Sequence, residues 1–274
     1  MTGGSPKPED DAVPKTVVVP LDGSDFALRA VPIAATLARC FGAELALMTT
    51  PMTREPVGRD EKPPWLEEAA TASGYERVHT LLAGDNYACP AIAALVDDLP
   101  GAVVCMTTRG HGRIAGTALG SMAQEVVRTL SRPVVLVGPQ CDEQWRADGP
   151  LIVCHDGSIA ADAILAPARM WAHALNEPIV IVHVFHPLDV ESSREPTQDI
   201  ARAIEFLEPD DVRVVASSYP VGAINALVEE LNPSLVAMST HGRTGLARIV
   251  LGSVATDVVH DSPCPVLVTR PRNL

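Results

Sequence analysis

The chain has 274 residues, of which 47% are hydrophobic and only 4% aromatic, and its formal net charge is −13. This length is ample for two domains of ordinary size, whose cores would be mainly aliphatic. An acidic surface repels phosphate backbones and anionic lipids. The composition therefore argues against a protein that binds nucleic acids or membrane surfaces non-specifically.

Strands and helices are predicted to alternate along the first half. A β-branched apolar run at 16–21 predicts a strand that ends in Asp22-Gly23-Ser24, and helical spacing follows over 27–41 with Gly42 as its stop. The remaining elements are a strand at 44–49, a loop at 51–64, a helix at 65–75, a strand at 77–82, a helix at 90–99, a strand at 102–107, a helix after Gly120 and a strand at 133–137. Continuous apolar strands alternating with helices predict a parallel sheet covered on both faces.

A glycine motif follows the fourth predicted strand and occurs twice in the chain. Nine residues separate Gly110 from Gly120-Ser121, and nine separate Gly242 from Gly252-Ser253. Glycine lets an anion approach the backbone closely, and unpaired N–H groups at a helix start favour phosphate. The motif therefore predicts a phosphate-binding arm in each half.

The first strand and the closing strand are repeated as well. Asp156-Gly157-Ser158 lies 134 residues after Asp22-Gly23-Ser24, and the segment 263–268 repeats 131–137. Three segments repeated in one order indicate a tandem duplication. We therefore divide the chain into a disordered tail (1–14), a first domain (15–139), a linker (140–149) and a second domain (150–274).

The N-terminal tail and the cysteines indicate the cellular compartment in which the protein is expected. Residues 1–14 carry no apolar core, so a signal peptide is not expected, and no apolar run reaches the ~20 residues that span a bilayer. The six cysteines form no C-x-x-C pair, which favours buried free thiols in a reducing cytoplasm. Cys141, in a polar stretch, is the alternative candidate for a redox sensor. We expect a soluble, cytoplasmic protein.

Together, the Asp-Gly-Ser turn, the G-x9-G-[S/T] motif and the Pro-Val-Leu-Val closing strand resemble the universal stress protein family. The resemblance spans residues 16–271, and two such domains in one chain resemble the tandem members of actinobacteria. It implies an α/β fold of two tandem doubly wound Rossmann-like domains (adenine nucleotide alpha hydrolase-like), each a five-stranded parallel sheet flanked by helices. The ligand is then expected in the crevice where the strand order reverses.

The resemblance implies ATP as the ligand, with Mg²⁺ only as the companion of the nucleotide. The aspartate after the first strand would lie near the ribose and adenine, a backbone group at the end of the second strand would face adenine, and the glycine-serine arm would hold the phosphates. The implied positions are, in the two halves, Asp22, Thr50, Thr107, Gly110, Gly120, Ser121 and Met122, and Asp156, Val184, Ser239, Gly242, Gly252, Ser253 and Val254. We expect a nucleotide-binding regulatory protein of stress response or dormancy, whose occupied arm is read by a protein partner.

Thr107 and Ser239 depart from the full ATP-binding pattern of the family, G-x2-G-x9-G-[S/T], because they replace its first glycine. A side chain there either crowds the sugar-phosphate or contributes a hydroxyl. The first alternative leads to a tandem scaffold with degenerate, empty sites. Asp22 and Asp156 also have a structural alternative, since an Asp-Gly-Ser turn caps a helix. The second half, which keeps Gly245 and Leu246, is the favoured nucleotide site.

Motifs for catalysis and metal binding are missing from the sequence. It has no P-loop, no Gly-x-Ser-x-Gly elbow and no histidine pair with metal-ligand spacing. A slow ATPase is therefore a less favoured alternative to a binding protein. His155 and His241 are expected near the mouth of the crevice, as ligand contacts or as solvent-facing loop residues.

The closing strands would expose sheet edges if each half stood alone. In the family that the chain resembles, this last strand pairs two domains. We therefore expect 134–137 and 266–268 to form an intramolecular pseudo-dimer that hides both edges. Homodimerisation of the whole chain is a separate expectation.

Overall fold

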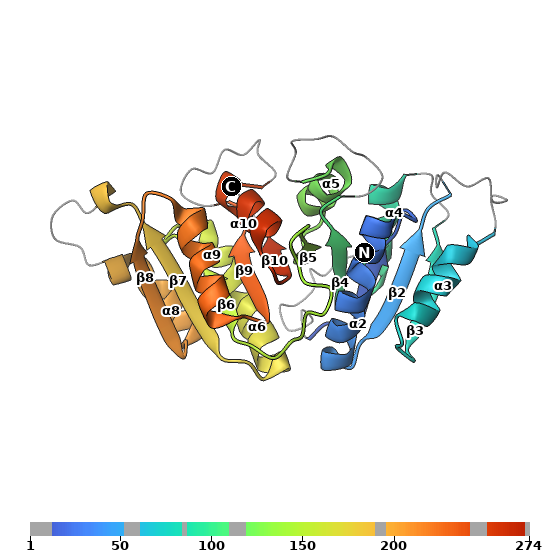
Figure 1. Cartoon of the computed structure of the whole chain (residues 1–274), viewed down its shortest axis with the longest axis horizontal. Helices are drawn as coiled ribbons and strands as arrows, with labels where there is room; N and C mark the ends of the chain where they lie inside the picture. The colour runs from blue at the N-terminus through green and yellow to red at the C-terminus, as the bar shows by residue number, and fades with distance from the viewer. Residues whose placement is uncertain are drawn as a thin grey trace, which may run out of the picture.

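Two five-stranded units, one from each half of the sequence, make up the computed structural model of the chain (Figure 1). The structure describes residues 13–51, 61–83, 87–109, 119–189, 196–241 and 251–271. The first half contains, in chain order, β1 (Thr16–Pro20), α1 (Asp25–Leu28), α2 (Ala30–Phe41), β2 (Glu44–Thr49), α3 (Pro64–Ala72), β3 (Val78–Leu82), α4 (Ala88–Asp98), β4 (Ala102–Thr107), α5 (Ser121–Thr129) and β5 (Val134–Val137). The second half contains β6 (Leu151–Cys154), the 3-10 helix η2 (Ala161–Ile164), α6 (Leu165–Leu175), β7 (Ile179–Phe185), η3 (Pro187–Asp189), α7 (Pro196–Asp199), α8 (Ala201–Leu207), β8 (Asp211–Ala216), α9 (Pro220–Leu231), β9 (Leu235–Ser239), α10 (Ser253–Asp261) and β10 (Val266–Thr269).

Each unit is a parallel sheet whose winding direction reverses beside its first strand. In the first half the strands lie in the order β3-β2-β1-β4-β5, so β1 pairs with β2 on one side and with β4 on the other. The second half repeats this arrangement, with β6 between β7 and β9. Because ligands of open parallel sheets bind outside the carboxyl ends of the strands at such a reversal, the carboxyl ends of β1 and β6 are the places where a ligand is expected.

The two closing strands join the units into one ten-stranded sheet. β5 and β10 pair antiparallel, with Leu267 opposite Val135 and Val268 opposite Val134. All side chains of both strands are buried. The predicted pairing of the closing strands within the chain is therefore confirmed, and this pairing occupies the edge that each unit would otherwise expose.

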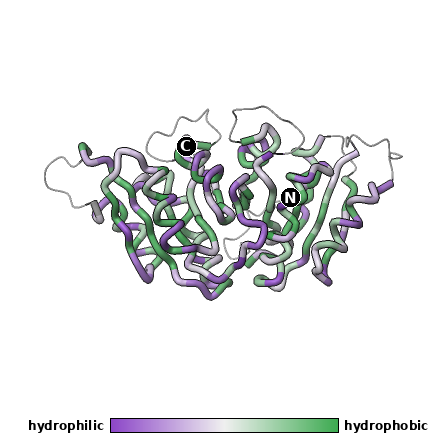
Figure 2. The backbone as a smooth tube through the Cα atoms, viewed as in Figure 1, coloured by the Kyte–Doolittle hydropathy of each residue, from purple (hydrophilic) through white to green (hydrophobic). Residues whose placement is uncertain are grey.

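Helices cover both faces of the sheet, which gives three layers. One core lies between the sheet and α2, α3, α6 and α8, and the other lies between the sheet and α4, α5, α9 and α10. Figure 2 shows hydrophobic residues running along the strands, whereas hydrophilic residues gather in the connections at the lower edge of the view. In the described part of the chain no helix is long and apolar enough to cross a membrane.

A second contact between the halves lies on the face covered by α2 and α6. The rings of Phe41 and Trp171 meet edge to face, with centroids 4.9 Å apart. The connection between the halves is also anchored on both sides. Arg29 donates to the carbonyls of Pro139 and Cys141, at 3.1 and 2.8 Å, and the indole of Trp145 donates to the Ser234 carbonyl at 2.7 Å.

The predicted helix at 27–41 is divided into α1 and α2 at Arg29. Pro32 explains the division, because it has no N–H to donate to the Leu28 carbonyl one turn earlier. Ser24 starts α1 earlier than predicted, since its hydroxyl accepts the Ala27 N–H at 3.1 Å. In the second half η2 takes the place of α1 before α6 begins.

Candidate functional site

A cavity of about 250 Å³ opens at the carboxyl ends of β6, β7 and β9, where the second unit reverses its strand order. Its walls include predicted binding positions that are far apart in the sequence, namely Asp156, Val184, Ser239, Gly252, Ser253 and Val254. Gly242, the remaining predicted position of this half, lies outside the described residues. The chain therefore brings an aspartate turn, two strand ends and a helix start around one hollow.

Asp156 shapes the turn that leaves β6. Its Oδ1 accepts the Ser158 N–H at 3.0 Å and the Ser158 hydroxyl at 2.6 Å, and the Ser158 oxygen accepts the Ala161 N–H at 3.1 Å. Asp22 and Ser24 form the same bonds after β1, with the same three distances. Both aspartates therefore stabilise the turn that begins the next helix, which is the structural alternative considered above. Asp156 does so on the cavity wall.

Gly252 forms the start of α10. Its N–H donates to the Thr240 carbonyl at 2.8 Å, which ties the helix start to the end of β9, and no side chain caps the helix. Ser253, Val254 and Ala255 follow along the cavity wall. Because the first N–H groups of a helix have no partner within it, this end of α10 offers hydrogen-bond donors and a partial positive charge to the cavity.

The hydroxyls at the altered glycine positions are bound by the protein itself. Ser239 Oγ donates to the Ala160 carbonyl at 2.9 Å, beneath the turn that follows β6, while Ser239 still contributes to the cavity wall. In the first half Thr107 Oγ1 donates to the Arg109 carbonyl at 2.7 Å. These hydroxyl protons are therefore used within the protein, and only the oxygens remain as acceptors.

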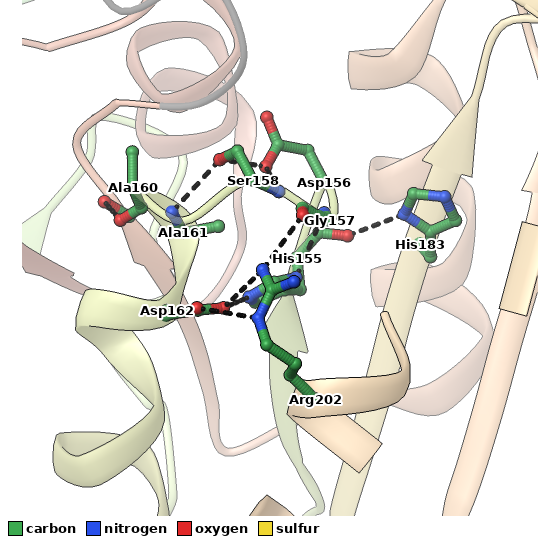
Figure 3. Close-up of polar contacts among 10 residues, drawn as sticks. His155, Asp156, Gly157, Ser158, Ala160, Ala161, Asp162, His183 and Arg202 are labelled. Carbon is green, nitrogen blue, oxygen red and sulfur yellow. Dashed lines mark hydrogen bonds and ion pairs between the residues drawn. The ribbon is translucent and has the colours of Figure 1, made fainter. Parts of the chain in front are cut away.

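The two histidines expected at the mouth differ in their surroundings. Nδ1 of His241 lies 2.9 Å from the Thr240 hydroxyl, and both residues are on the cavity wall. The His155 side chain is fully buried, and its Nε2 lies 3.0 Å from Asp162 Oδ1 (Figure 3). His155 lies on the cavity wall, as expected, but the alternative of a solvent-facing loop residue is wrong, because its ring is buried and turns to the Asp162 carboxylate.

The predicted positions of the first half also converge beside the strand reversal. Asp22 follows β1, Thr50 follows β2, Thr107 ends β4, and Gly120 precedes α5, which begins at Ser121-Met122. Gly110 lies outside the described residues. The Gly120 N–H donates to the Thr108 carbonyl at 2.6 Å, as Gly252 does to Thr240.

Larger side chains distinguish the first half from the second at the matching positions. Met48 stands where the second half has Val182, and Met122 stands where it has Val254. Met48 is fully buried. In the first half, the longer Met48 side chain therefore occupies the position at which Val182 lines the cavity in the second half.

The cysteines of the central sheet lie in environments that suppress the thiolate. Burial raises the pKa of both Cys141 and Cys154 to about 12, so neither is a nucleophile or a sensitive thiol at neutral pH. The alternative of Cys141 as a redox sensor is therefore disfavoured. No group of three or more potential ligands among the described residues could hold a metal ion.

Part of the cavity wall has no signal in the sequence. Pro220 and Ile224 reach it from α9, the helix that crosses from β8 to β9. Both sit in an ordinary amphipathic pattern, and only the packing of α9 against the sheet identifies them as cavity residues. Likewise, the partners of His155 could not be paired with it from spacing alone.

Comparison with known proteins covers nearly the whole chain. The family model described as the universal stress protein family matches residues 14–138 and 149–270. Two relatives from Mycobacterium tuberculosis H37Rv, the universal stress proteins Rv2005c and Rv2623, are each 26% identical. The alignments cover 93% of this chain and 96% of Rv2005c, and 95% of this chain and 94% of Rv2623.

Solved structures share the fold over the same length. A universal stress protein from Archaeoglobus fulgidus has a TM-score of 0.69 at 20% identity, with 96% of this chain and 99% of that chain covered. A protein from Pseudomonas aeruginosa PAO1 has a TM-score of 0.63 at 15% identity, with coverage of 97% and 95%. Since the two matched regions correspond to the two halves of the sheet, the chain belongs to the universal stress protein family, with two family domains in tandem.

Proposed function

We propose that the second half binds an adenine nucleotide, ATP with Mg²⁺ as its companion, and that the protein acts through occupancy of this site in the response to stress or in dormancy. The observation that carries the proposal is the cavity itself. An apolar hollow, a carboxylate and an uncapped helix start meet at the strand reversal, and these are the three environments that a base, a ribose and a phosphate require.

The described residues match the parts of a nucleotide in size and chemistry. The volume of about 250 Å³ is near the lower end of small-molecule pockets, about 300 Å³, and suits the nucleoside part of the ligand. Val182, Ile224 and Met238 provide apolar contact for a base, and Asp156 provides an acceptor for ribose hydroxyls. The phosphates would then lie against the N–H groups that begin α10.

The second half is the better site for physical reasons. The first half has Met48 and Met122 where the second half has Val182 and Val254. These longer side chains add volume at the position that would contact the base and at the start of the helix. Binding is therefore expected to be tighter in the second half. Nucleotide binding at the start of α10 would change the surface that a partner protein contacts.

We favour binding over catalysis. The cavity wall holds Asp156, whose Oδ1 is engaged in its own turn, Cys154, whose thiol is kept protonated by burial, and His241, whose Nδ1 contacts the Thr240 hydroxyl. These contacts pair none of the three with another as a nucleophile and its base. A scaffold with empty sites is the second candidate, and the hydrogen bond of the Ser239 hydroxyl to Ala160 favours it, because that proton is then not offered to a ligand.

Calorimetric titration with ATP tests the proposal on variants of Gly252. An added Cβ there would lie 3.4 Å from the Thr240 carbonyl, so Gly252→Ala is accommodated with little adjustment, and the backbone of Gly252 is in an extended region open to any residue. Gly252→Asp adds a negative charge where phosphate would bind, and aspartate is a good helix cap, so this variant should fold.

We expect saturable binding by the wild type, its retention in Gly252→Ala and its loss in Gly252→Asp. Ser121→Asp reports on the first half, because Ser121 is exposed at the start of α5, whereas a Cβ at Gly120 would lie only 2.9 Å from the Thr108 carbonyl oxygen. Co-purified nucleotide, seen in the ultraviolet absorbance ratio of desalted protein, would support the same conclusion. A folded wild type that takes up no ATP would refute the proposal and leave the scaffold.

A further inference from the structure

A chain of polar side chains lies beneath the Asp156 turn and reaches the cavity wall at His155 (Figure 3). Arg202 of α8 contacts Asp162 of η2, with 3.1 Å between Nε and Oδ2, and Asp162 Oδ1 contacts His155 Nε2 at 3.0 Å. The His155 side chain is fully buried, whereas the Arg202 side chain is 54% exposed. The chain of contacts therefore runs from the surface of α8 to the end of β6.

Both backbone groups of Gly157 are bound by this chain of contacts. The Gly157 N–H donates to His155 Nδ1 at 3.1 Å, and the Gly157 carbonyl accepts from Arg202 Nη2 at 3.3 Å. Gly157 has a φ of +83°, and an added Cβ would lie 2.9 Å from Asp199 Cβ. Its peptide groups are thus held from below while its neighbour Asp156 faces the cavity.

These contacts fix the protonation state of the His155 ring. Because a backbone N–H points at Nδ1, this nitrogen must be an acceptor, so the proton is on Nε2 and is donated to Asp162. The His155 carbonyl accepts from His183 Nδ1 at 2.8 Å, which anchors the same residue through its backbone. The neutral ring with one tautomer is the only form that makes both side-chain bonds.

The first half builds the same turn with apolar side chains at the positions of the network. Leu21 and Leu28 stand at the positions of His155 and Asp162, and Trp65 stands at the position of Asp199. A Cβ on Gly23 would lie 3.0 Å from the Trp65 ring, so this ring covers the glycine that matches Gly157. One fold thus contains two identical turns, one packed by apolar side chains and one held by hydrogen bonds.

We propose that Arg202, Asp162 and His155 form a positioning network for the nucleotide site of the second half, which holds the Asp156–Ser158 turn in its binding conformation. This inference rests on the proposed function of that site. Asp162 and Arg202 lie off the cavity wall, and only His155 of the three reaches it. The network acts on Asp156 through the Gly157 peptide groups, and it gives the second site a dependence on proton concentration.

The direction of that dependence follows from the hydrogen bonds. Protonation of His155 Nδ1 removes the acceptor of the Gly157 N–H, so acid conditions release the turn. Burial lowers the pKa of the His155 ring, opposed chiefly by the nearby Asp162 carboxylate, so the ring is neutral at pH 7. The charged and titratable groups around the ring and its turn are Asp162 on η2, Arg202 on α8, Asp156 beside it, His183 on β7 and Asp199 on α7.

The test measures ATP affinity of the second site in full-length protein that carries Ser121→Asp, which places a negative charge at the start of α5 from an exposed position. Arg202→Met removes the donor to Gly157 and keeps an aliphatic side chain. The matched control is Arg169→Met on α6, since Arg169 is also exposed and donates to a carbonyl, that of Phe206, without touching the turn. A second variant, His155→Leu with Asp162→Leu, introduces the residues of the first half.

We expect Arg202→Met to bind ATP about tenfold more weakly than the control at about pH 7.5, the size typical for one charge-assisted hydrogen bond. The double leucine variant should also bind more weakly there, and its deficit relative to the unaltered network should shrink as the pH falls from about 7.5 to about 4.5, a window that extends well below the ordinary histidine value because the pKa of His155 is lowered by burial. Titration of the ATP phosphates affects both proteins alike, so the ratio isolates His155.

Two results overturn the positioning network while the nucleotide function stands. One is an Arg202→Met affinity within about twofold of the Arg169→Met control. The other is a ratio between the double leucine variant and the unaltered network that does not change with pH. If the wild type binds no ATP at all, the nucleotide function itself fails, and the positioning role fails with it.

Discussion

Glu177 provides a direct test of how the junction between the halves responds to pH. It follows α6, and its Oε2 accepts the Ser234 hydroxyl while its Oε1 is buried without a hydrogen-bond partner. It also lies close enough to Cys40, at the end of α2 in the first half, to raise the pKa of that thiol. Glu177→Gln keeps the acceptor for Ser234 and removes the charge.

The sign of the effect follows from the raised pKa. Burial, and to a smaller degree the charge of Asp148, raises the pKa of Glu177 from 4.5 to about 7, opposed by the bond from Ser234. The folded state then holds a proton that the unfolded state releases between these values, so stability falls as pH rises across this window. The full shift corresponds to about 3 kcal/mol, and solvent screening at a half-buried carboxyl reduces it to about 1–2 kcal/mol.

Urea unfolding at several pH values measures this difference. We expect Glu177→Gln to exceed the wild type in free energy of unfolding by about 1–2 kcal/mol at about pH 8 and to match it at about pH 4.5. Glu229→Gln, an exposed glutamate on α9, is the control for loss of one negative charge. Parallel stability curves for Glu177→Gln and wild type, or a less stable Glu177→Gln at pH 8, would refute the reasoning.

Two further predictions concern the seam and the thiols. Leu267 is fully buried opposite Val135 where the halves join, so Leu267→Ala should lower the free energy of unfolding by about 2–5 kcal/mol in urea titrations. A loss under about 1 kcal/mol would show that the seam is dispensable. Cys40 is exposed and the other five cysteines are buried. Mass spectrometry after brief alkylation of the native protein should therefore find one modified site, and rapid labelling of Cys141 would contradict its burial.

The fold was predictable because its determinants are local and repeated. Most strands are short apolar runs, and the turn after the first strand of each half carries an Asp-Gly-Ser signal. The closing strand appears twice, so its pairing at the seam followed from the need to cover two equal edges. The division at Arg29 was missed although its cause, Pro32, is visible in the sequence. The apolar spacing of a helix continues across Arg29, although the backbone hydrogen bond from residue 32 to the Leu28 carbonyl is missing.

The site was predictable only where a residue belongs to a motif. Asp156, Ser239 and Gly252 follow strand ends, and parallel strands bring their carboxyl ends to one edge, so their meeting at the cavity needed no long-range information. Ile224 and Arg202 carry no such signal, because each is one amphipathic or charged helix position among many. Their roles depend on how α9 and α8 pack on the sheet, which periodicity leaves open.

The two halves show which part of a duplicated site is fixed by local chemistry and which part is free to differ. The aspartate turn has the same three hydrogen-bond distances after β1 and after β6. Yet Leu21 lies under one turn, beside the Trp65 ring that covers Gly23, and His155 lies under the other, bonded to Gly157 and Asp162. The same turn geometry is therefore reached with two different supports, and only the support in the second half contains a histidine.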